Sequence, residues 1–261
     1  MQAKEVQTYL QSMAGDWPYP TDTVDTFKAG DPTVEITGIA VGWMSYSWAL
    51  EEAVRKNCNL FITHEPTLYD HHDKNPDVFR FEAANKKRHY IAEHGLVVLR
   101  CHDLWDRIPE IGIPDSWGAY LGFQNAVHGD DYIRIFDVGK KSALEIAQGV
   151  SAVLRQLGHE RVQLIGPSDK QVRFVATGTG AITPFMRCLD EFQADMVICT
   201  DDGLWYWRDG ALAIDAGVPL LVVNHAVSEE AGMVSLANHL RQIFPSIPIH
   251  HLPQRCMYQL V

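Results

Sequence analysis

The sequence predicts an α/β protein of two similar lobes, each with a mixed, largely parallel sheet. Short apolar runs alternate with segments of helical length in both halves of the chain, a pattern typical of strands joined by helices. The 261 residues are 46% hydrophobic and 21% charged, which is enough apolar material for a sizeable core. We expect a first lobe over residues 1–128 and a second over residues 129–261, whose last helix and strand can pack back on the first.

In the first half, helices are predicted where apolar residues recur at helical spacing, and strands where apolar residues run continuously. Segments rich in glycine and proline are expected to be loops. The expected elements are a helix at 4–13, a loop at 15–25, a strand at 34–41, a helix at 47–57, a strand at 60–63, a helix at 76–93, a strand at 96–101 and a mostly looped stretch at 108–129 with a helical turn or two.

In the second half, Ser142 is a suitable N-cap and Gly158 a suitable helix stop. Ser228 is likewise expected to cap the last helix, placing Glu229 in its first turn. The expected elements are strands at 132–138, 162–165, 172–177 and 196–200, a strand ending at His225, a final strand at 247–251, and helices at 142–157, 183–192, 205–216 and 228–243.

Charge and composition exclude several classes of protein. The net charge of −11 repels phosphate backbones and anionic lipid, so we expect neither a nucleic-acid nor a membrane partner. The N-terminus has no apolar signal core and no run has transmembrane length, so we expect a cytoplasmic protein. The five cysteines are scattered without a C-x-x-C pair, which indicates buried thiols in a reducing compartment.

Three apolar runs end on a histidine that an acidic residue follows closely. The pairs are His64 with Glu65, His102 with Asp106, and His225 with Glu229. Ligands bind beyond the carboxyl ends of strands in open α/β sheets, and imidazole with carboxylate is the usual ligand mix for Zn, Mn, Fe or Co. A single strand-end histidine is more often a hydrogen-bonded loop residue. Three at the same topological position favour a metal centre in the cleft between the lobes.

These motifs, in this order, resemble the NIF-three-like dinuclear metal-centre hexameric protein family, also known as GTP cyclohydrolase type-two homologues. His64-Glu65-Pro66 matches the family's His-His-Pro, and the segment from His102 to Asp106 matches His-Thr-Asn-x-Asp. Asn224-His225 through Glu229 matches Gly-His-x-x-x-Glu. The segments Gly178-Thr179-Gly180 and Thr200-Asp201-Asp202 echo two further family motifs.

The resemblance implies two adjacent divalent ions and a ring-like homohexamer. His102 then ligates, orients a ligand or carries a proton, and Glu65 is the other candidate proton carrier. The metal ion is Mn, Fe, Zn or Co. The implied metal ligands are His64, Glu65, Asp106, His225 and Glu229.

Glu65 departs from the family pattern because it replaces the second histidine. Its harder oxygen favours Mn, Fe or Mg over Zn, and it adds a third carboxylate charge to those of Asp106 and Glu229. We therefore expect Glu65→His to shift the bound metal toward Zn without unfolding the protein. Loss of one metal position is the competing outcome. Residues 103–105, Asp-Leu-Trp where Thr-Asn is usual, are a second departure.

The implied function is metal-dependent hydrolysis of a cyclic amide, a nucleotide or a phosphoester. The alternatives are a metal-binding regulatory or scaffold protein without turnover, and a protein that stores or delivers metal. Other segments have weaker interpretations. Segment 69–73 lines the mouth of the site or is a solvated loop, and segment 178–180 holds an anion or is a tight turn. Asp201 and Asp202 face the site or form a turn. Segment 205–208 stacks a planar substrate, forms a subunit contact or packs in the core, and His250 and His251 are structural.

Overall fold

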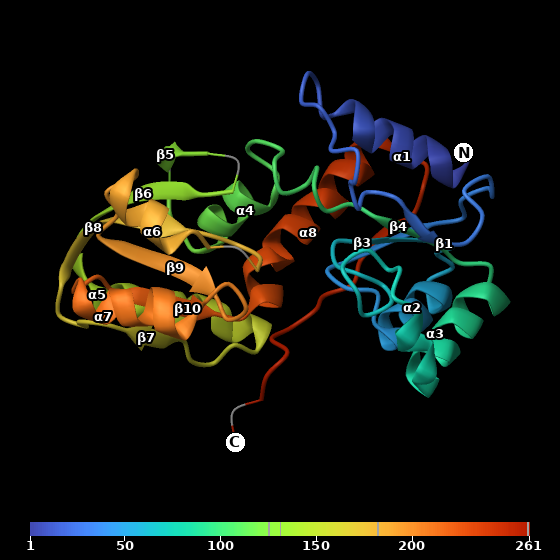
Figure 1. Cartoon of the computed structure of the whole chain (residues 1–261). Helices are drawn as coiled ribbons and strands as arrows, with labels where there is room; N and C mark the ends of the chain where they lie inside the picture. The colour runs from blue at the N-terminus through green and yellow to red at the C-terminus, as the bar shows by residue number, and fades with distance from the viewer. Residues whose placement is uncertain (125, 131, 182, 260) are drawn as a thin grey trace. The chain divides into compact units, whose positions relative to one another are not determined.

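The computed structural model describes residues 1–124, 126–130, 132–181, 183–259 and 261. The chain divides into two compact units (Figure 1). Unit 1 comprises Met1–Ile108 and Met233–Pro253, and unit 2 comprises Pro109–Gly232 and Gln254–Val261. Residues 109–128 belong to unit 2, whose core contains Trp117 and Leu121, although the sequence pattern suggests the first lobe.

Unit 1 is built on a five-stranded sheet in the order β1-β4-β3-β2-β11. The pairs β4–β3, β3–β2 and β2–β11 are parallel, and β1 lies antiparallel to β4. Every residue of the three central strands is buried, as expected for strands covered on both faces. The strands are β1 (Phe27–Ala29), β2 (Ile39–Gly42), β3 (Leu60–Thr63), β4 (Val97–Arg100) and β11 (Ile249–His251).

Helices cover both faces of this sheet. The helices α2 (Ser47–Arg55) and α3 (Glu82–Glu93) pack on one face, where Leu50 and Ile91 share a core with Phe61 and Val98. The helix α1 (Ala3–Ser12) lies on the other side (Figure 1). The predicted long helix at 76–93 is wrong in one detail. A short 3₁₀ helix (Pro76–Arg80) precedes α3, and Phe81 between them is extended.

Unit 2 is built on a six-stranded sheet in the order β5-β6-β8-β9-β10-β7. Only β8–β9 and β9–β10 are parallel among its described pairs, so this sheet is mixed rather than largely parallel. The α/β class is confirmed in both units. The strands are β5 (Ala126–Gly129), β6 (Arg134–Ser142), β7 (Gln163–Ile165), β8 (Gln171–Thr177), β9 (Met196–Thr200) and β10 (Leu220–Val223).

Two helical layers enclose the sheet of unit 2. On one face, α4 (Ile113–Tyr120) and α5 (Ala143–Leu154) pack on Val175 and Ile198. On the other, α6 (Phe185–Asp190) and α7 (Ala211–Asp215) pack on the intervening strand residues, such as Val197. The stretch 108–129 is thus less looped than expected. The predicted helix at 205–216 is divided into a π-helical turn (Tyr206–Gly210) and α7.

The last helix, α8 (His225–Ile243), begins three residues earlier than predicted. Ser228 is therefore not its cap; its hydroxyl donates to the backbone oxygen of His225 at 2.8 Å. The first residue of α8 is tied instead to Asp201, whose Oδ1 accepts the His225 backbone N–H at 3.1 Å. This cap comes from another loop, so the sequence around the helix start does not reveal it.

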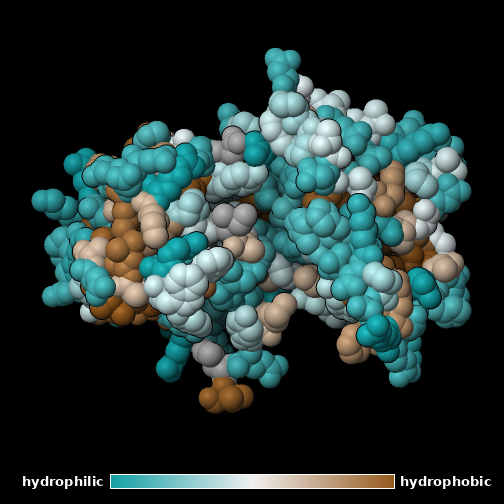
Figure 2. Space-filling view, in the orientation of Figure 1, coloured by the Kyte–Doolittle hydropathy of each residue, from teal (hydrophilic) through white to brown (hydrophobic). Residues whose placement is uncertain are grey.

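The face drawn in Figure 2 is mostly polar. Figure 2 shows hydrophobic side chains gathered over α6 and α7 of unit 2, where Met186 and Ile214 are exposed. No helix in the described part of the chain has an apolar stretch long enough to span a bilayer.

Candidate metal centre

The parallel strands of unit 1 bring two of the predicted motifs to one edge of the sheet. His64 follows β3 directly, and His102 lies two residues beyond β4. The two strands are neighbours in parallel register, with Thr63 opposite Arg100. The backbone N–H groups of His64 and Glu65 both donate to the oxygen of Trp43, at 3.1 and 2.8 Å, which fixes the turn after β3.

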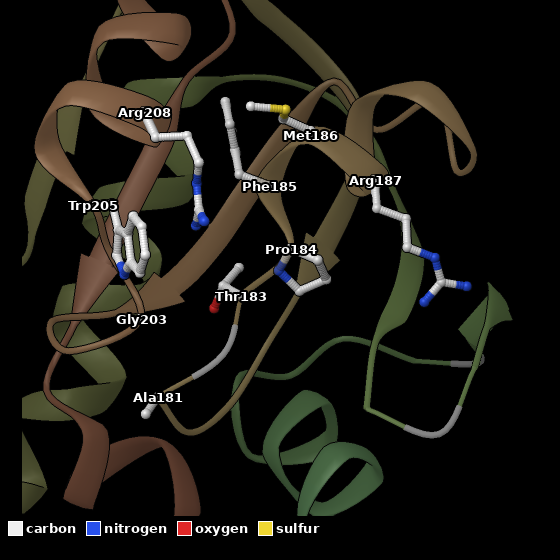
Figure 3. A pocket seen from close by; sticks show the side chains of 9 residues that line it. All are labelled: Ala181, Thr183, Pro184, Phe185, Met186, Arg187, Gly203, Trp205 and Arg208. Carbon is white, nitrogen blue, oxygen red and sulfur yellow. The ribbon is translucent and has the colours of Figure 1, made fainter.

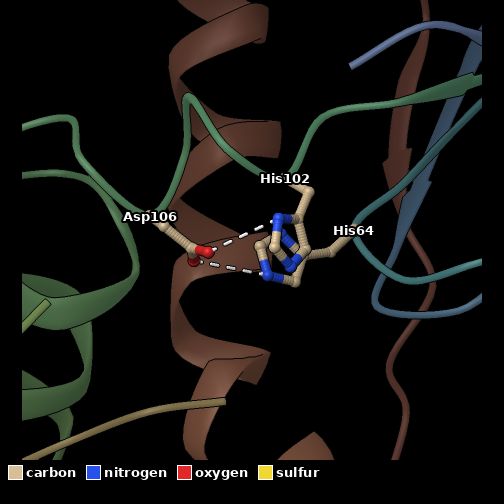
Figure 4. Close-up of side chains that lie close together, drawn as sticks. All are labelled: His64, His102 and Asp106. Atoms are coloured by element: carbon tan, nitrogen blue, oxygen red, sulfur yellow. Dashed lines mark ion pairs between the residues drawn. The ribbon is translucent and has the colours of Figure 1, made fainter. Parts of the chain in front are cut away.

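His64, His102 and Asp106 form one compact group of potential ligands (Figure 4). Nε2 of His64 lies 3.4 Å from Oδ1 of Asp106, and Nδ1 of His102 lies 3.6 Å from Oδ2 of the same carboxylate. The two imidazole rings are stacked with centroids 4.6 Å apart. His64 and Asp106 are buried, and one donor atom from each of the three residues lies within 4.8 Å of the others. This spacing suits a divalent ion with nitrogen and oxygen ligands.

Second contacts orient these imidazoles. Nδ1 of His64 lies 3.1 Å from the backbone oxygen of Cys101, which leaves Nε2 toward Asp106. Nδ1 of His102 lies 2.9 Å from Oδ1 of Asp103. Partners of this kind fix ring orientation and raise ligand basicity in metal sites.

The charges around His102 shift two pKa values. Burial lowers the pKa of His102, but Asp106, Asp103 and Glu65 outweigh burial and raise it to about 9. Burial raises the pKa of Asp103, yet its hydrogen bonds with His102 and Thr23 hold it well below the usual carboxyl range. The group therefore has the negative field that attracts a cation.

Asp25 holds the turn that carries His102 and Asp106. Its carboxylate accepts the backbone N–H groups of His102, Asp103 and Leu104, at 2.6, 3.0 and 2.9 Å. Asp25 is buried, and that burial raises the pKa of its carboxyl despite the N–H donors. The loop assignment at 15–25 gave no sign of this role, because the partners lie far away in the sequence.

Glu65 lies at the edge of this group. Its Oε1 is 4.0 Å from Nε2 of His102, and its Oε2 is 3.2 Å from Nη2 of Arg100. Glu65 is buried, at 9% exposure. The sequence pattern did not predict a role for Arg100, because this residue occupies the last position of an otherwise apolar strand.

Unit 2 contains the third motif. Nε2 of His225 lies 3.0 Å from Oε1 of Glu229, and its Nδ1 lies 2.8 Å from Oδ2 of Asp202. Because α8 already begins at His225, the spacing of four places His225 and Glu229 on one helical face. Asp202 orients His225, and Asp201 binds the His225 backbone and the Asn224 side chain.

The turn after β8 leaves room beside these side chains. Gly180 has φ +69°, and a Cβ there would lie 3.3 Å from Oε1 of Glu229 and 3.7 Å from Nε2 of His225. The hydroxyl of Thr200 donates to the oxygen of Gly180 and so holds the turn in place. Of the two interpretations of segment 178–180, the tight turn agrees with this geometry, because α6 begins only at Phe185. Imidazole and carboxylate in each unit, with the cleared backbone at Gly180 in unit 2, fit a divalent metal ion.

Unit 2 also has a pocket of about 350 Å³, and its lining residues lie between Ala181 and Arg208, ahead of the third motif in the sequence. Gly203 lines it and donates to Thr200, whose hydroxyl also contacts Asp202 at 3.0 Å. Figure 3 shows Arg208 extending beside the ring of Trp205 toward Thr183, whereas Arg187 points away from them. The lining residues are Ala181, Thr183, Pro184, Phe185, Met186, Arg187, Gly203, Trp205 and Arg208.

Aromatic and polar groups share this pocket. Trp205 is 50% exposed, which excludes the core interpretation of this side chain. The Arg208 guanidinium lies 4.5 Å from a Trp205 ring centroid and is paired with the buried carboxylate of Asp209. The Thr183 hydroxyl is buried and has no hydrogen-bond partner among the described residues. Such a site suits a flat ring with a polar edge.

Comparisons with known proteins follow the same outline. The model of the Duf34/NIF3 (NGG1p interacting factor 3) family matches residues 1–255. The chain belongs to the Duf34/NIF3 family. The family resemblance of the strand-end motifs is thereby confirmed.

Individual relatives of this Duf34/NIF3 chain are distant. The GTP cyclohydrolase 1 type 2 homolog of Clostridium acetobutylicum is 24% identical over 200 residues, covering 72% of this chain and 73% of that protein. The Staphylococcus aureus hypothetical protein SA1388 matches with a TM-score of 0.83 at 16% identity, over 100% of this chain and 99% of that chain. A Bacillus cereus protein related to NIF3 matches with a TM-score of 0.83 at 13% identity, over the same shares. At these identities the solved structures support the fold.

The remaining histidine segments lie outside the ligand groups described within the two units. His71 contacts the His102 ring edge-on, with centroids 6.0 Å apart, and stacks edge-on with His72 at 4.8 Å. His250 and His251 belong to β11, as their predicted structural role requires. In this Duf34/NIF3 chain, Arg100, Asp25 and Asp103 are the site residues that sequence reasoning missed.

Proposed function

We propose that this Duf34/NIF3 chain binds divalent metal ions through His64, Glu65, Asp106, His225 and Glu229, and uses them for hydrolysis. The observation that carries the proposal is the group of His64, His102 and Asp106, with donor atoms within 4.8 Å of one another. The order of the family motifs supports assigning the ligands of both units to one dinuclear centre. Bound divalent ions would supply an activated water and polarise the bond that it attacks.

In this proposal His102 moves the proton. Its Nδ1 is held by Asp103 at 2.9 Å, and its ring is stacked on His64. An imidazole that is oriented by a carboxylate and lies beside the ligands is well placed to give up a proton and regain it, and its raised pKa keeps it protonated at the start. Glu65 acts as a ligand and not as the proton carrier, because Arg100 holds one of its oxygens.

The pocket beside Trp205 supports a substrate with a flat ring. Of the three expected substrate classes, cyclic amides and nucleotides have such a ring, and a simple phosphoester has none. A ring stacked on Trp205 could place a polar edge toward the Thr183 hydroxyl. We therefore rank cyclic amides and nucleotides above simple phosphoesters.

Elemental analysis of protein purified without added metal tests the binding. We expect Mn, Fe, Zn or Co in the wild type and a large loss in Asp106→Asn, with metal content unchanged in His250→Gln. His250 is a suitable control because it is a histidine of β11, outside the ligand group. Equal metal content in wild type and Asp106→Asn would contradict the proposal. Activity of the metal-loaded protein is then measured on cyclic amides, nucleotides and phosphoesters.

A regulatory or scaffold protein is the second candidate function. The exposed aromatic side chains of Trp205, Tyr206 and Trp207 favour it, since such residues are enriched in protein interfaces. A centre that stays filled with metal but is inert on all three substrate classes supports this alternative. Readily exchanging metal supports storage or delivery instead.

We also propose that the chain forms a closed homo-oligomer, with a hexamer as the expected state. The exposed apolar residues Met186 of α6 and Ile214 of α7 support burial against another copy. Light scattering tests this; a monomer mass across a dilution series would contradict it.

A further inference from the structure

Arg100 is a buried cation whose guanidinium hydrogen bonds, among the described residues, go to one short segment. It ends β4 and is 1% exposed. Its Nε donates to the backbone oxygen of His64 at 2.8 Å, and its Nη1 donates to the oxygen of His71. Its Nη2 contacts Oε2 of Glu65 at 3.2 Å. The guanidinium thus binds two backbone carbonyls and one carboxylate of segment 64–71.

The pairing with Glu65 is a matter of charge as well as shape. A buried guanidinium is costly unless an anion compensates it, and removing one partner of a buried pair is strongly destabilising. Backbone carbonyls supply hydrogen bonds but no full charge. Glu65, where the family pattern has histidine, supplies that charge.

We propose that Arg100 is the specificity-determining residue that allows a glutamate ligand at position 65: it compensates the carboxylate in the metal-free protein and moderates the charge that the carboxylate offers to the ion. Arg100 holds Oε2, which leaves Oε1, on the side of His102, to serve the ion. Its positive charge offsets the negative charge that Glu65 adds to those of Asp106 and Glu229. With Arg100 beside it, Glu65 differs from a histidine ligand in the hardness of its donor atom. The net charge of the Glu65–Arg100 pair is zero, as for a neutral histidine. This inference rests on the proposed metal binding.

The proposal changes the expectation for Glu65→His. On its own, that substitution leaves Arg100 buried beside the ligands without a carboxylate, so both folding and cation binding suffer. Replacing Arg100 by methionine as well makes positions 65 and 100 a neutral pair of histidine and methionine. Only the double variant Glu65→His with Arg100→Met should therefore move the metal preference toward Zn cleanly.

The experiment is a double-mutant cycle in metal affinity. Wild type, Glu65→His, Arg100→Met and the double variant are stripped of metal and titrated calorimetrically with MnCl₂ and with ZnCl₂. We expect Glu65→His to weaken binding of both ions roughly 10- to 100-fold, because it leaves the uncompensated charge of Arg100 beside the ligands. The double variant should regain Zn binding but not Mn binding.

Thermal unfolding gives a second readout that does not depend on activity. Arg100→Met leaves the buried carboxylate of Glu65 without its guanidinium partner, so the metal-free protein should have a lower Tm. MnCl₂ should raise that Tm by more than it raises the wild-type Tm, because the ion then supplies the missing positive charge. The matched control is Arg134→Met in unit 2, which breaks a pair with Asp115 (Nε to Oδ1 2.7 Å) away from the ligands. It should lower the Tm without changing either affinity.

The outcomes separate this inference from the proposed function. If the wild type binds Mn and Zn but the two substitutions act additively, Arg100 only shapes segment 64–71 and the inference is overturned. The same holds if MnCl₂ raises the Tm of Arg100→Met no more than that of the wild type. A wild-type protein that binds neither ion overturns the proposed function and this inference together.

Discussion

The carboxylate of Asp25 accepts the backbone N–H of His102 at 2.6 Å, across 77 residues of sequence. The same carboxylate also accepts the N–H groups of Asp103 and Leu104. Asp25 thus does for this turn what an N-cap side chain does for a helix, but from a different part of the chain. The positions of His102 and Asp106 depend on it.

Asp25→Ala should therefore lower both stability and metal affinity, although Asp25 is not a proposed ligand. Losing a buried charged acceptor costs about 2–4 kcal/mol in the free energy of unfolding, and metal affinity should fall about 10- to 100-fold. Urea denaturation and calorimetry with MnCl₂ measure these effects. Asp31→Ala is the control, because Asp31 caps the exposed turn at Thr33 in the same way. Unchanged metal affinity in Asp25→Ala would mean that the turn keeps its shape without the cap.

Gly180→Ala should weaken metal binding more than its backbone strain explains. The added Cβ would lie 3.3 Å from Oε1 of Glu229, in a residue with φ +69°. Gly217→Ala is a matched control, because Gly217 has φ +62° and nothing within 4 Å of its Cβ position. Both variants should lose roughly 1 kcal/mol of stability from the left-handed conformation. Only Gly180→Ala should lose metal affinity; equal affinities would show that the ligands tolerate the methyl group.

Trp205→Ala should weaken binding of flat heterocycles, whereas Trp207→Ala should not. Trp205 lines the pocket, and its neighbour Trp207 is 76% exposed and does not. Loss of one aromatic stacking partner corresponds to roughly a tenfold change in affinity. Calorimetric titration of metal-free protein with hydantoin and with guanosine 5′-monophosphate measures it. If both variants bind these probes like the wild type, the pocket is not the ring site.

Lys87 predicts a pH dependence of stability. Burial lowers its pKa from 10.5 to about 8, although its Nζ donates to the Thr67 oxygen at 3.0 Å. Between pH 8 and 10.5 the unfolded chain therefore holds a proton that the folded protein has released, so stability rises with pH in this window. Relative to Lys87→Met, the wild type should gain up to about 3 kcal/mol from pH 8 to 10.5, as measured by urea denaturation. A constant difference across that range would mean that Lys87 keeps an ordinary pKa.

The sequence was sufficient to predict which strands carry the site, because continuous apolar runs define buried strands and parallel neighbours end at one edge. The run 60–63 and the group of His64, His102 and Asp106 follow from that rule. The assignment of all five proposed ligands to one centre stays a prediction. Glu65 was predictable as a departure from the family pattern, but its partner was not.

The rest depends on contacts that are distant in sequence. Asp25 and Asp201 cap backbone turns that lie 77 and 24 residues away, so no local cap signal exists for them. The apparent signal at Ser228 was misleading for the same reason. Arg100 lies in a strand whose other residues are apolar, and only the fold brings it to Glu65. Local patterns define elements, whereas the tertiary contacts define which side chains they orient.

The ion pair of Glu65 and Arg100 has an evolutionary consequence. Starting from a histidine at position 65 with a neutral residue at position 100, either substitution alone places an uncompensated charge in a buried place. The intermediate is less fit whichever change comes first, so the two residues should be inherited together. Lineages with arginine at position 100 should carry an acidic residue at position 65, and the pair should mark a separate branch among the relatives of this chain.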